Sequence, residues 1–189
     1  LLYGPAGSGK TSIARILTEG YDYLYLNGSS ENGIDIVRNQ IVSFASQLSL
    51  EDGAEKLKIV NIDECDGFTE ASWSAMRETI EHYANSVRFI MTCNKFDKIP
   101  SFIRSRFNCI PVYPINNEES ELLFSAYCQC VGAILSKLKI SYEDDVLKEF
   151  VKTNFPDMRS ILNTIQALYL QGAAELDRDS LIKTFDCSD

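Results

Sequence analysis

Histidine is almost absent from the sequence, with one residue among 189, and the six cysteines include no C-x-x-C pair. A structural zinc site needs several such ligands at short spacing, so the sequence argues against one. We expect His82 to be structural and the cysteines to be reduced thiols, most of them buried. The cysteines are Cys65, Cys93, Cys109, Cys128, Cys130 and Cys187.

Long apolar runs are also missing. No run reaches the roughly 18 to 20 apolar residues that would span a bilayer, and no charged-then-apolar leader opens the chain. We therefore expect a soluble, cytoplasmic protein that has no membrane partner.

Basic residues are in deficit. The 18 lysines and arginines face 27 aspartates and glutamates, which leaves a net charge of −9. Nonspecific DNA affinity comes from neutralising phosphates with Lys and Arg side chains, so this composition argues against a protein that coats nucleic acid. Any contact with DNA must be local.

Strands and helices are expected to alternate over the first 114 residues. The expected strands are 1–3, 23–27, 57–62, 87–93 and 109–112, and the expected helices are 11–19, 34–48 and 69–83. This alternation predicts an α/β fold built from βαβ units around a parallel sheet.

The sequence after residue 114 predicts helices only. They are expected at 118–137, 143–154, 157–171 and 180–185, separated by a capping signature at Ser141–Asp144 and by Pro156. We therefore expect two domains, a nucleotide-binding α/β domain over 1–114 and a helical domain over 115–189.

The segment Gly4–Thr11 matches the phosphate-loop pattern G-x-x-x-x-G-K-[ST] at every fixed position. Backbone N–H groups and the positive end of the following helix bind phosphate oxygens, Lys10 reaches the β and γ phosphates, and the Thr11 hydroxyl binds Mg²⁺. Because almost none of the strand before such a loop is present, we expect the domain to be truncated at its N-terminus. The residues expected to contact the nucleotide here are Gly4, Pro5, Ala6, Gly7, Ser8, Gly9, Lys10, Thr11 and Ser12.

Polar residues follow the next two apolar strands. Asp63 ends the strand 57–62, where a parallel sheet presents side chains to a ligand, and we assign it to Mg²⁺. Glu64 is the candidate general base. Asn94 follows the strand 87–93 and is expected to lie beside Asp63, where its amide would orient the attacking water. A turn residue is the other interpretation of Asn94.

The sequence Asn94-Lys95-Phe96-Asp97 raises guanine as an alternative base, since it spells N-K-x-D, the guanine-recognition pattern of small GTPases. GTPases carry Asp-x-x-Gly after the metal-binding strand, whereas Glu64 stands three positions before Gly67. The pair Asp63-Glu64 is typical of ATPases, so we expect ATP.

Four segments resemble the ATPase subunits of clamp loaders, which are AAA+ proteins. They are the run Asn27–Asn39, the acidic box Asp63–Asp66, the serine-arginine motif Ser105–Phe107 and the second sensor Asp157–Arg159. Phe107 departs from the family, which has cysteine there. The stretch 154–157 is more similar to the clamp loader large subunit of T-even-type phages than to cellular replication factor C, and both origins stay open.

The resemblance covers nearly the whole chain and implies a P-loop AAA+ module, with a five-stranded parallel sheet, flanking helices and a small all-helical lid. It further implies an ATPase of DNA replication that opens a ring-shaped sliding clamp and closes it on primer–template DNA. The implied partners are the clamp, the DNA and the other subunits of a hetero-pentameric spiral that holds several copies of this chain. For a phage protein, the location would be the host cytoplasm.

The resemblance also assigns roles to two arginines. Arg106 would reach into the neighbouring subunit's site and stabilise charge on the transferred phosphoryl group, and Arg159 would reach the nucleotide of its own subunit from the lid. Without the resemblance, exposed basic side chains remain the alternative for both.

DNA contacts are implied near the start of the helix 34–48. Gly33, Ile34 and Arg38 would hold phosphates through helix N–H groups and one positive charge, which suits an acidic subunit. An intrahelical ion pair is the alternative for Arg38. Asn27 would link DNA contact to the posture of Glu64.

Two other functions stay open. A different AAA+ machine, such as a branch-migration helicase or a helicase loader, is disfavoured by the run Asn27–Asn39. A nucleotide-binding scaffold that never hydrolyses is disfavoured by the presence of Lys10, Asp63, Glu64 and Asn94.

The choice of ATP over GTP predicts the outcome of a competition experiment. We expect ATP to displace a bound fluorescent adenine nucleotide, and GTP at equal concentration to displace little. Displacement by GTP as effective as that by ATP would reverse the assignment.

Overall fold

A parallel β-sheet organises the first part of the chain in the computed structural model, which describes residues 1–47, 50–51, 54–55 and 57–177. Among these residues the sheet has five strands in the order β2-β5-β6-β1-β7, and every pairing within it is parallel. The expected five-stranded parallel sheet is therefore confirmed. The strands are β1 Leu2–Tyr3, β2 Asp22–Asn27, β5 Lys58–Asp63, β6 Val87–Cys93 and β7 Ile110–Pro111.

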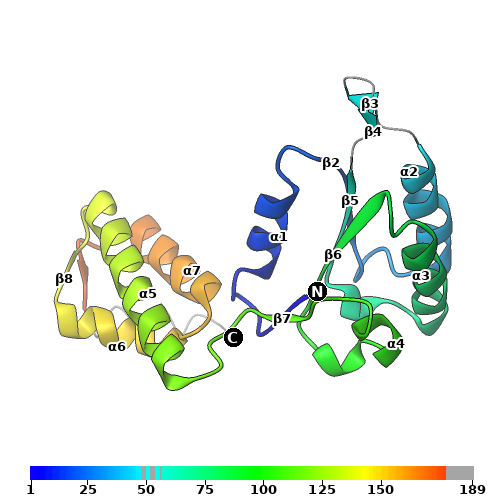
Figure 1. The fold of residues 1–189 in the computed structure, drawn as a ribbon. Coiled ribbons are helices and arrows are strands. Elements are labelled where there is room, and N and C mark those ends of the chain that lie inside the picture. The colour runs from blue at the N-terminus through cyan, green and yellow to red at the C-terminus, as the bar shows by residue number, and fades with distance from the viewer. Residues whose placement is uncertain (48–49, 52–53, 56, 178–189) are drawn as a thin grey trace. The chain divides into compact units, whose positions relative to one another are not determined.

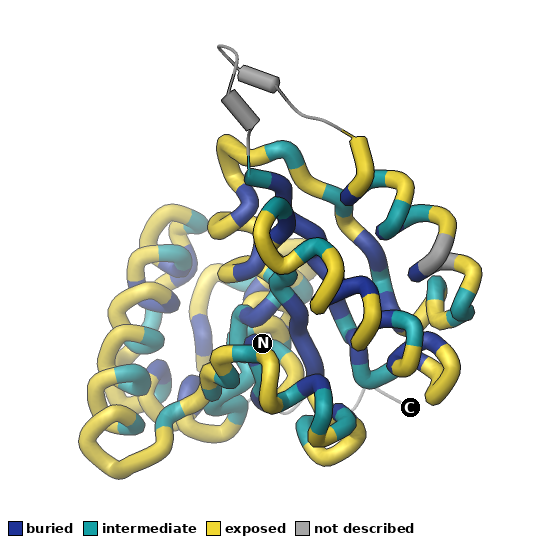
Figure 2. The backbone as a smooth tube through the Cα atoms, turned by 45° about the vertical axis from the view of Figure 1, so that its right-hand side comes forward, coloured by how far each residue is buried: buried dark blue, intermediate teal, exposed yellow. Residues whose placement is uncertain are grey.

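Helices cover both faces of this sheet (Figure 1). Helix α1, Lys10–Thr18, lies on one face, and α2, Val42–Ser46, and α3, Glu70–His82, lie on the other. Strand β5 is buried at every residue, as expected for a central parallel strand, and Figure 2 shows buried backbone along the strands. The remaining short elements of this part are β3 Leu50–Glu51, β4 Ala54–Glu55, η2 Cys65–Gly67, η3 Phe96–Lys98 and α4 Ser101–Arg104.

The segment expected as one α-helix over 34–48 differs from that prediction. Residues Ile36–Ile41 form a π-helix, η1, and α2 ends at Ser46. A wider turn inserted in a helix cannot be recognised from the spacing of apolar residues in the sequence. The buried Lys58 explains the end, because its Nζ donates to the carbonyl oxygens of Phe44, at 2.7 Å, and Gln47. A positive charge is favourable at the carboxyl end of a helix.

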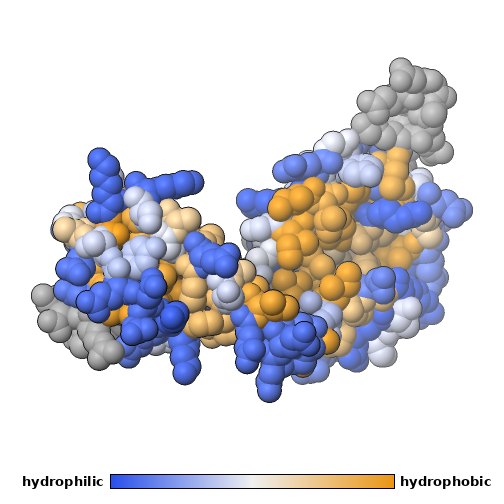
Figure 3. Space-filling model, turned by 60° about the vertical axis from the view of Figure 1, so that its left-hand side comes forward, coloured by the Kyte–Doolittle hydropathy of each residue, from blue (hydrophilic) through white to orange (hydrophobic). Residues whose placement is uncertain are grey.

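Apolar side chains remain exposed on the α1 side of the sheet (Figure 3). Ile16 and Leu17 of α1 are more than half exposed, and Ile110 of β7 is 49% exposed. A groove of about 400 Å³ extends from Leu17 of α1 to Ile80 of α3, and its lining includes Phe107. A single short helix therefore covers only part of this face.

The chain divides into two compact units. One comprises Leu1–Gly4 with Gly9–Val112, and the other comprises Pro5–Ser8 with Tyr113–Asp189. The domain boundary expected between residues 114 and 115 stays a prediction.

The second unit is a helical cluster. Its helices are α5 Asn117–Leu138, α6 Asp144–Asn154 and α7 Met158–Leu170, which pack on a core that includes Val131, Leu135, Phe150, Ile161 and Ile165. The expectation of helices alone was incomplete, because β8 Ser141–Tyr142 pairs in parallel with β9 Glu175–Leu176. The helix expected at 180–185 lies outside the described residues.

The capping signature expected at Ser141–Asp144 was wrong. Ser141 belongs to β8, and its hydroxyl donates to the carbonyl oxygen of Ala174. Glu143 precedes α6 without a side-chain cap. The local pattern assigned Ser141 to a helix start, but the residue instead lies in a strand that pairs with a strand distant in sequence.

The cysteines that the structure describes are free thiols, and fewer of them are buried than expected. Among the five in the described part of the chain, Cys65 and Cys93 are buried, Cys109 and Cys128 are half-buried, and Cys130 is exposed. None of the helices in the described part is both long and apolar enough to cross a membrane.

Two glycines permit the backbone after β2 to contact the turn after β5. A Cβ on Gly67 would lie 2.6 Å from the carbonyl oxygen of Gly28, and a Cβ on Gly28 would lie 2.8 Å from that of Glu64. Both distances are far shorter than a van der Waals contact. The atoms that would be met belong to the backbone, so they have no freedom to rotate away. Any side chain at either position must push the two segments apart.

We therefore expect Gly67→Ala to lower the free energy of unfolding by about 1–3 kcal/mol, the usual cost of overpacking. Gly33→Ala is the control, since a Cβ there meets nothing within 4 Å. Urea denaturation of both variants measures the effect, and equal midpoints for them would contradict the close approach.

Candidate active site

The phosphate loop connects β1 to α1. Gly9 is the N-cap of α1 with φ 91°, in the left-handed region that glycine adopts without strain. No side chain caps this helix and no acidic residue lies in its first turn. The first turn therefore carries no negative side chain of its own where the loop pattern predicted a phosphate.

Two residues of the loop point toward the sheet. Lys10 is only 6% exposed, and its Nζ donates to the carbonyl oxygen of Gly4 at 3.1 Å. The Thr11 hydroxyl donates to Oδ1 of Asp63 at 3.0 Å. The structure thus brings Thr11 and Asp63 together, whereas Ser12 is exposed on the outer side of the helix.

Asp63 is a buried carboxylate at the end of β5, 6% exposed. Besides Thr11, it accepts hydrogen bonds from the hydroxyl of Thr92 on β6 and, at 3.2 Å, from that of Tyr25 on β2. Burial and the negative charge of Asp63 raise the pKa of Tyr25, which keeps this hydroxyl protonated as a donor. Hydroxyl donors from three elements therefore satisfy one acidic side chain.

Thr92 takes the place beside Asp63 that was expected for Asn94. The parallel register pairs Ile62 with Met91, so the next residue of β6 stands opposite Asp63. Sequence reasoning missed both Thr92 and Tyr25. A threonine inside the apolar strand 87–93 was the available signal, but it acquires meaning only once the register is known.

The donor set of Thr11 and Asp63 suits Mg²⁺. This ion keeps several waters and binds one or two carboxylates together with substrate phosphates, rather than an all-protein cage. The described residues contain no group of three or more His, Cys, Asp or Glu side chains that could hold a metal. One hydroxyl and one carboxylate next to a phosphate loop therefore fit an ion carried in with a nucleotide.

Glu64 occupies a strained turn. Its φ is 53° and its ψ is 42°, the left-handed conformation, which costs a non-glycine residue roughly 1–2 kcal/mol. Its N–H donates to Oγ1 of Thr92 at 3.1 Å, and its carbonyl oxygen accepts from the N–H of Gly67 at 3.0 Å. Strain of this kind is concentrated at functional sites, where surrounding contacts maintain it.

Asn94 follows β6 and is exposed. Its N–H donates to Oδ1 of Asp66 at 3.3 Å, and the N–H of Lys95 donates to Oδ2 of the same carboxylate at 3.2 Å. Asp66 lies two residues after Glu64, so this pair of bonds joins the two candidate catalytic segments. The sequence contained Asp66 within the acidic box but offered no reason to assign it a contact.

Asn27 ends β2 opposite Asp63. Its Oδ1 accepts from the N–H groups of Ser29 and Ser30, at 2.9 and 3.3 Å. The connection between this segment and the acidic turn runs through the backbone, since the N–H of Gly28 donates to the carbonyl oxygen of Asp63 at 2.7 Å. The role of Asn27 as a link to Glu64 stays a prediction.

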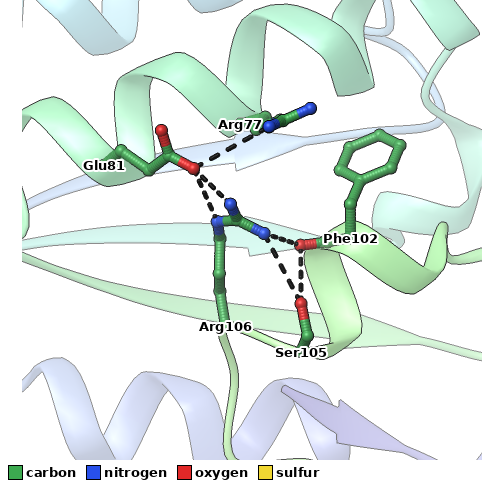
Figure 4. Close-up of polar contacts among 5 residues, drawn as sticks. All are labelled: Arg77, Glu81, Phe102, Ser105 and Arg106. Atoms are coloured by element: carbon green, nitrogen blue, oxygen red, sulfur yellow. Dashed lines mark hydrogen bonds and ion pairs between the residues drawn. The ribbon is translucent and has the colours of Figure 1, made fainter.

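Arg106 contacts residues of its own chain (Figure 4). Its Nε donates to Oε1 of Glu81 at 3.0 Å and its Nη2 contacts the same oxygen, while Nη1 donates to the carbonyl oxygen of Phe102. Arg77 approaches Oε1 of Glu81 at 3.7 Å. The segment that carries Arg106 lies just beyond α4, which ends at Arg104, rather than on the helix itself.

The remaining candidate residues belong to other segments of the chain. Arg159 is exposed on α7 of the second unit. Gly33 and Ile34 are half-buried where the chain turns into η1, and the side chain of Arg38 lies outside what the structure describes. The nucleotide and DNA roles of these residues stay predictions.

The sequence is similar to several known proteins. A family model described as "ATPase family associated with various cellular activities (AAA)" matches residues 1–113. The chain is 36% identical to replication factor C subunit 3 of Oryza sativa subsp. japonica over 90% of this chain and 47% of that protein. It is 33% identical to the replication factor C small subunit of Sulfurisphaera tokodaii over 94% of this chain and 54% of that protein. It spans about half the length of the curated relatives it matches.

Among solved structures, the RuvB Holliday junction branch migration motor of Thermotoga maritima has a similar fold. The TM-score is 0.67 at 19% sequence identity, over 98% of this chain and 60% of that chain. At this level of identity the likeness extends to the fold alone.

The ion pair of Arg106 predicts a pH dependence. Hydrogen bonding and charge from Arg106, with a smaller effect of Arg77, hold the pKa of Glu81 below the ordinary value of 4.5. A carboxyl whose pKa is depressed on folding loses its stabilising pair only as the pH falls through the folded-state pKa, so the pair persists at neutral pH.

In a carboxyl NMR titration we expect Arg106→Gln to raise the pKa of Glu81, and Arg77→Gln to raise it less. An unchanged titration of Glu81 in the Arg106 variant would show that the contact does not form in solution.

Proposed function

The chain belongs to the ATPase family associated with various cellular activities, and we propose that it binds ATP with Mg²⁺ and hydrolyses it as one subunit of a sliding-clamp loader. The observation that carries the ATPase proposal is the contact of Thr11 with Asp63 beside the buried Lys10. Similarity to replication factor C subunits supports the clamp loader.

Binding rests on the phosphate loop and the edge of the sheet. We infer that the loop N–H groups and Lys10 hold the phosphates, and that Thr11 and Asp63 hold Mg²⁺. When bound, the ion would neutralise negative charge on the phosphates. Thr92 and Tyr25 orient Asp63 by donating hydrogen bonds to its carboxylate.

Hydrolysis needs a water that is oriented and deprotonated. The Glu64 carboxylate accepts the proton of that water, and the Asn94 amide orients it toward the γ-phosphate. Arg106 acts on the site of the neighbouring subunit, where its charge stabilises the transferred phosphoryl group. Arg159 contacts the nucleotide from the helical lid, which we assign to 115–189, with the nucleotide-binding domain at 1–114.

The proposed assembly contains several copies of this chain with other loader subunits, and its substrates are a ring-shaped clamp and primer–template DNA. Contacts of Gly33, Ile34 and Arg38 with DNA phosphates, and of Asn27 with the catalytic turn, would make hydrolysis depend on DNA. ATP binding orders the assembly for clamp opening, and hydrolysis releases the clamp closed on DNA.

A branch-migration motor is the second candidate. The fold it shares with RuvB is compatible with it, but relatives above 30% identity over most of this chain are replication factor C subunits. Loading of a clamp on primed circular DNA by the full-length protein with its partner subunits distinguishes the two. Unwinding of a four-way junction without clamp loading would favour the motor.

The shared site predicts the behaviour of Arg106→Ala. We expect ATP binding near that of the wild type and a fall in assembly-dependent hydrolysis on the order of 10³-fold, as for other arginines acting in trans. Arg104→Ala is the control, because this nearby guanidinium lies over the ring of Phe96, 5.2 Å from its centroid. Phosphate release by the assembled complex is the measurement, and full activity of the isolated Arg106 variant would refute a shared site.

A further inference from the structure

The Asp66 carboxylate accepts two consecutive backbone N–H groups, those of Asn94 and Lys95. Each of its oxygens takes one of them, at 3.3 and 3.2 Å. Within the described residues these N–H groups donate to no other acceptor. The position of the Asn94 backbone therefore depends on where Asp66 is held.

The turn that carries Asp66 is held on three sides. Within the turn, the N–H of Gly67 donates to the carbonyl oxygen of Glu64, and the Cys65 side chain is fully buried beneath it. On the β2 side, Gly28 lies in backbone contact with Gly67. Asp66 consequently has little freedom to move independently of Glu64.

The chemistry of the contact requires a carboxylate. An ionised aspartate offers acceptors on both oxygens, and bonds to a charged acceptor are stronger than neutral ones. An asparagine of the same shape has one carbonyl oxygen, and its NH₂ group would face the second backbone N–H as donor against donor. Asp66→Asn therefore breaks at least one of the two hydrogen bonds.

We propose that Asp66 is a positioning residue for ATP hydrolysis, because it ties Asn94 to the turn of Glu64 and keeps the water-orienting amide at a fixed distance from the general base. The inference rests on the proposed function. Asp66 itself touches neither water nor phosphate in this role, and it acts through Asn94. A misplacement of about 1 Å in such a pair is enough to slow a reaction strongly.

The test uses the full-length protein in its assembly with partner subunits. We expect Asp66→Ala and Asp66→Asn to lower kcat on the order of ten-fold or more, with ATP affinity in a fluorescence titration unchanged. Asp97→Asn is the matched control, since this aspartate is exposed in the same loop and makes no hydrogen bond or ion pair within the described part of the chain. The control should keep wild-type kcat.

A double-mutant cycle with Asn94→Ala separates positioning from a merely structural role. If Asp66 acts through Asn94, Asp66→Ala causes no further loss of kcat in the Asn94→Ala background. Losses that multiply in the double variant, or a wild-type kcat in Asp66→Asn, would overturn the inference. An Asn94→Ala variant with full activity would instead refute the proposed role of Asn94, and so the proposed mechanism itself.

Discussion

A carboxylate removed from water must be supplied with hydrogen-bond donors, and this requirement at Asp63 organises the site. Its donors come from α1, β2 and β6 through Thr11, Tyr25 and Thr92. Three elements that are distant in sequence therefore converge on one strand end. The phosphate loop is held against the sheet by the same contact that places a hydroxyl and a carboxylate together for a metal ion.

The acidic turn after β5 depends on this arrangement. Thr92 donates to Asp63 and accepts from the N–H of Glu64, so one hydroxyl connects the buried carboxylate to the strained residue that follows it. The close approach of Gly28 and Gly67 holds the turn on the β2 side, and Asp66 connects it to the loop after β6. Hydrogen bonds and close backbone contacts thus connect the ends of three adjacent strands, β2, β5 and β6.

The Arg106 cluster is a separate feature of the same unit. The guanidinium is partly exposed and held at the surface by Glu81 on α3. An exposed pair of this kind is weak enough to be exchanged for another anion. That property agrees with a role toward a neighbouring subunit.

Local patterns in the sequence were sufficient for the phosphate loop, the alternation of strands and helices, and the carboxylates at the end of β5, because loop chemistry and side-chain periodicity act over a few residues. They failed for the π-helix at Ile36–Ile41 and for Ser141, where a wider helical turn and a distant strand override the local preference. The contacts of Thr92, Tyr25 and Asp66 could not be predicted from these patterns. Their roles follow from the register of parallel strands and the path of one turn, and only the tertiary structure brings together groups that are 28 to 38 residues apart.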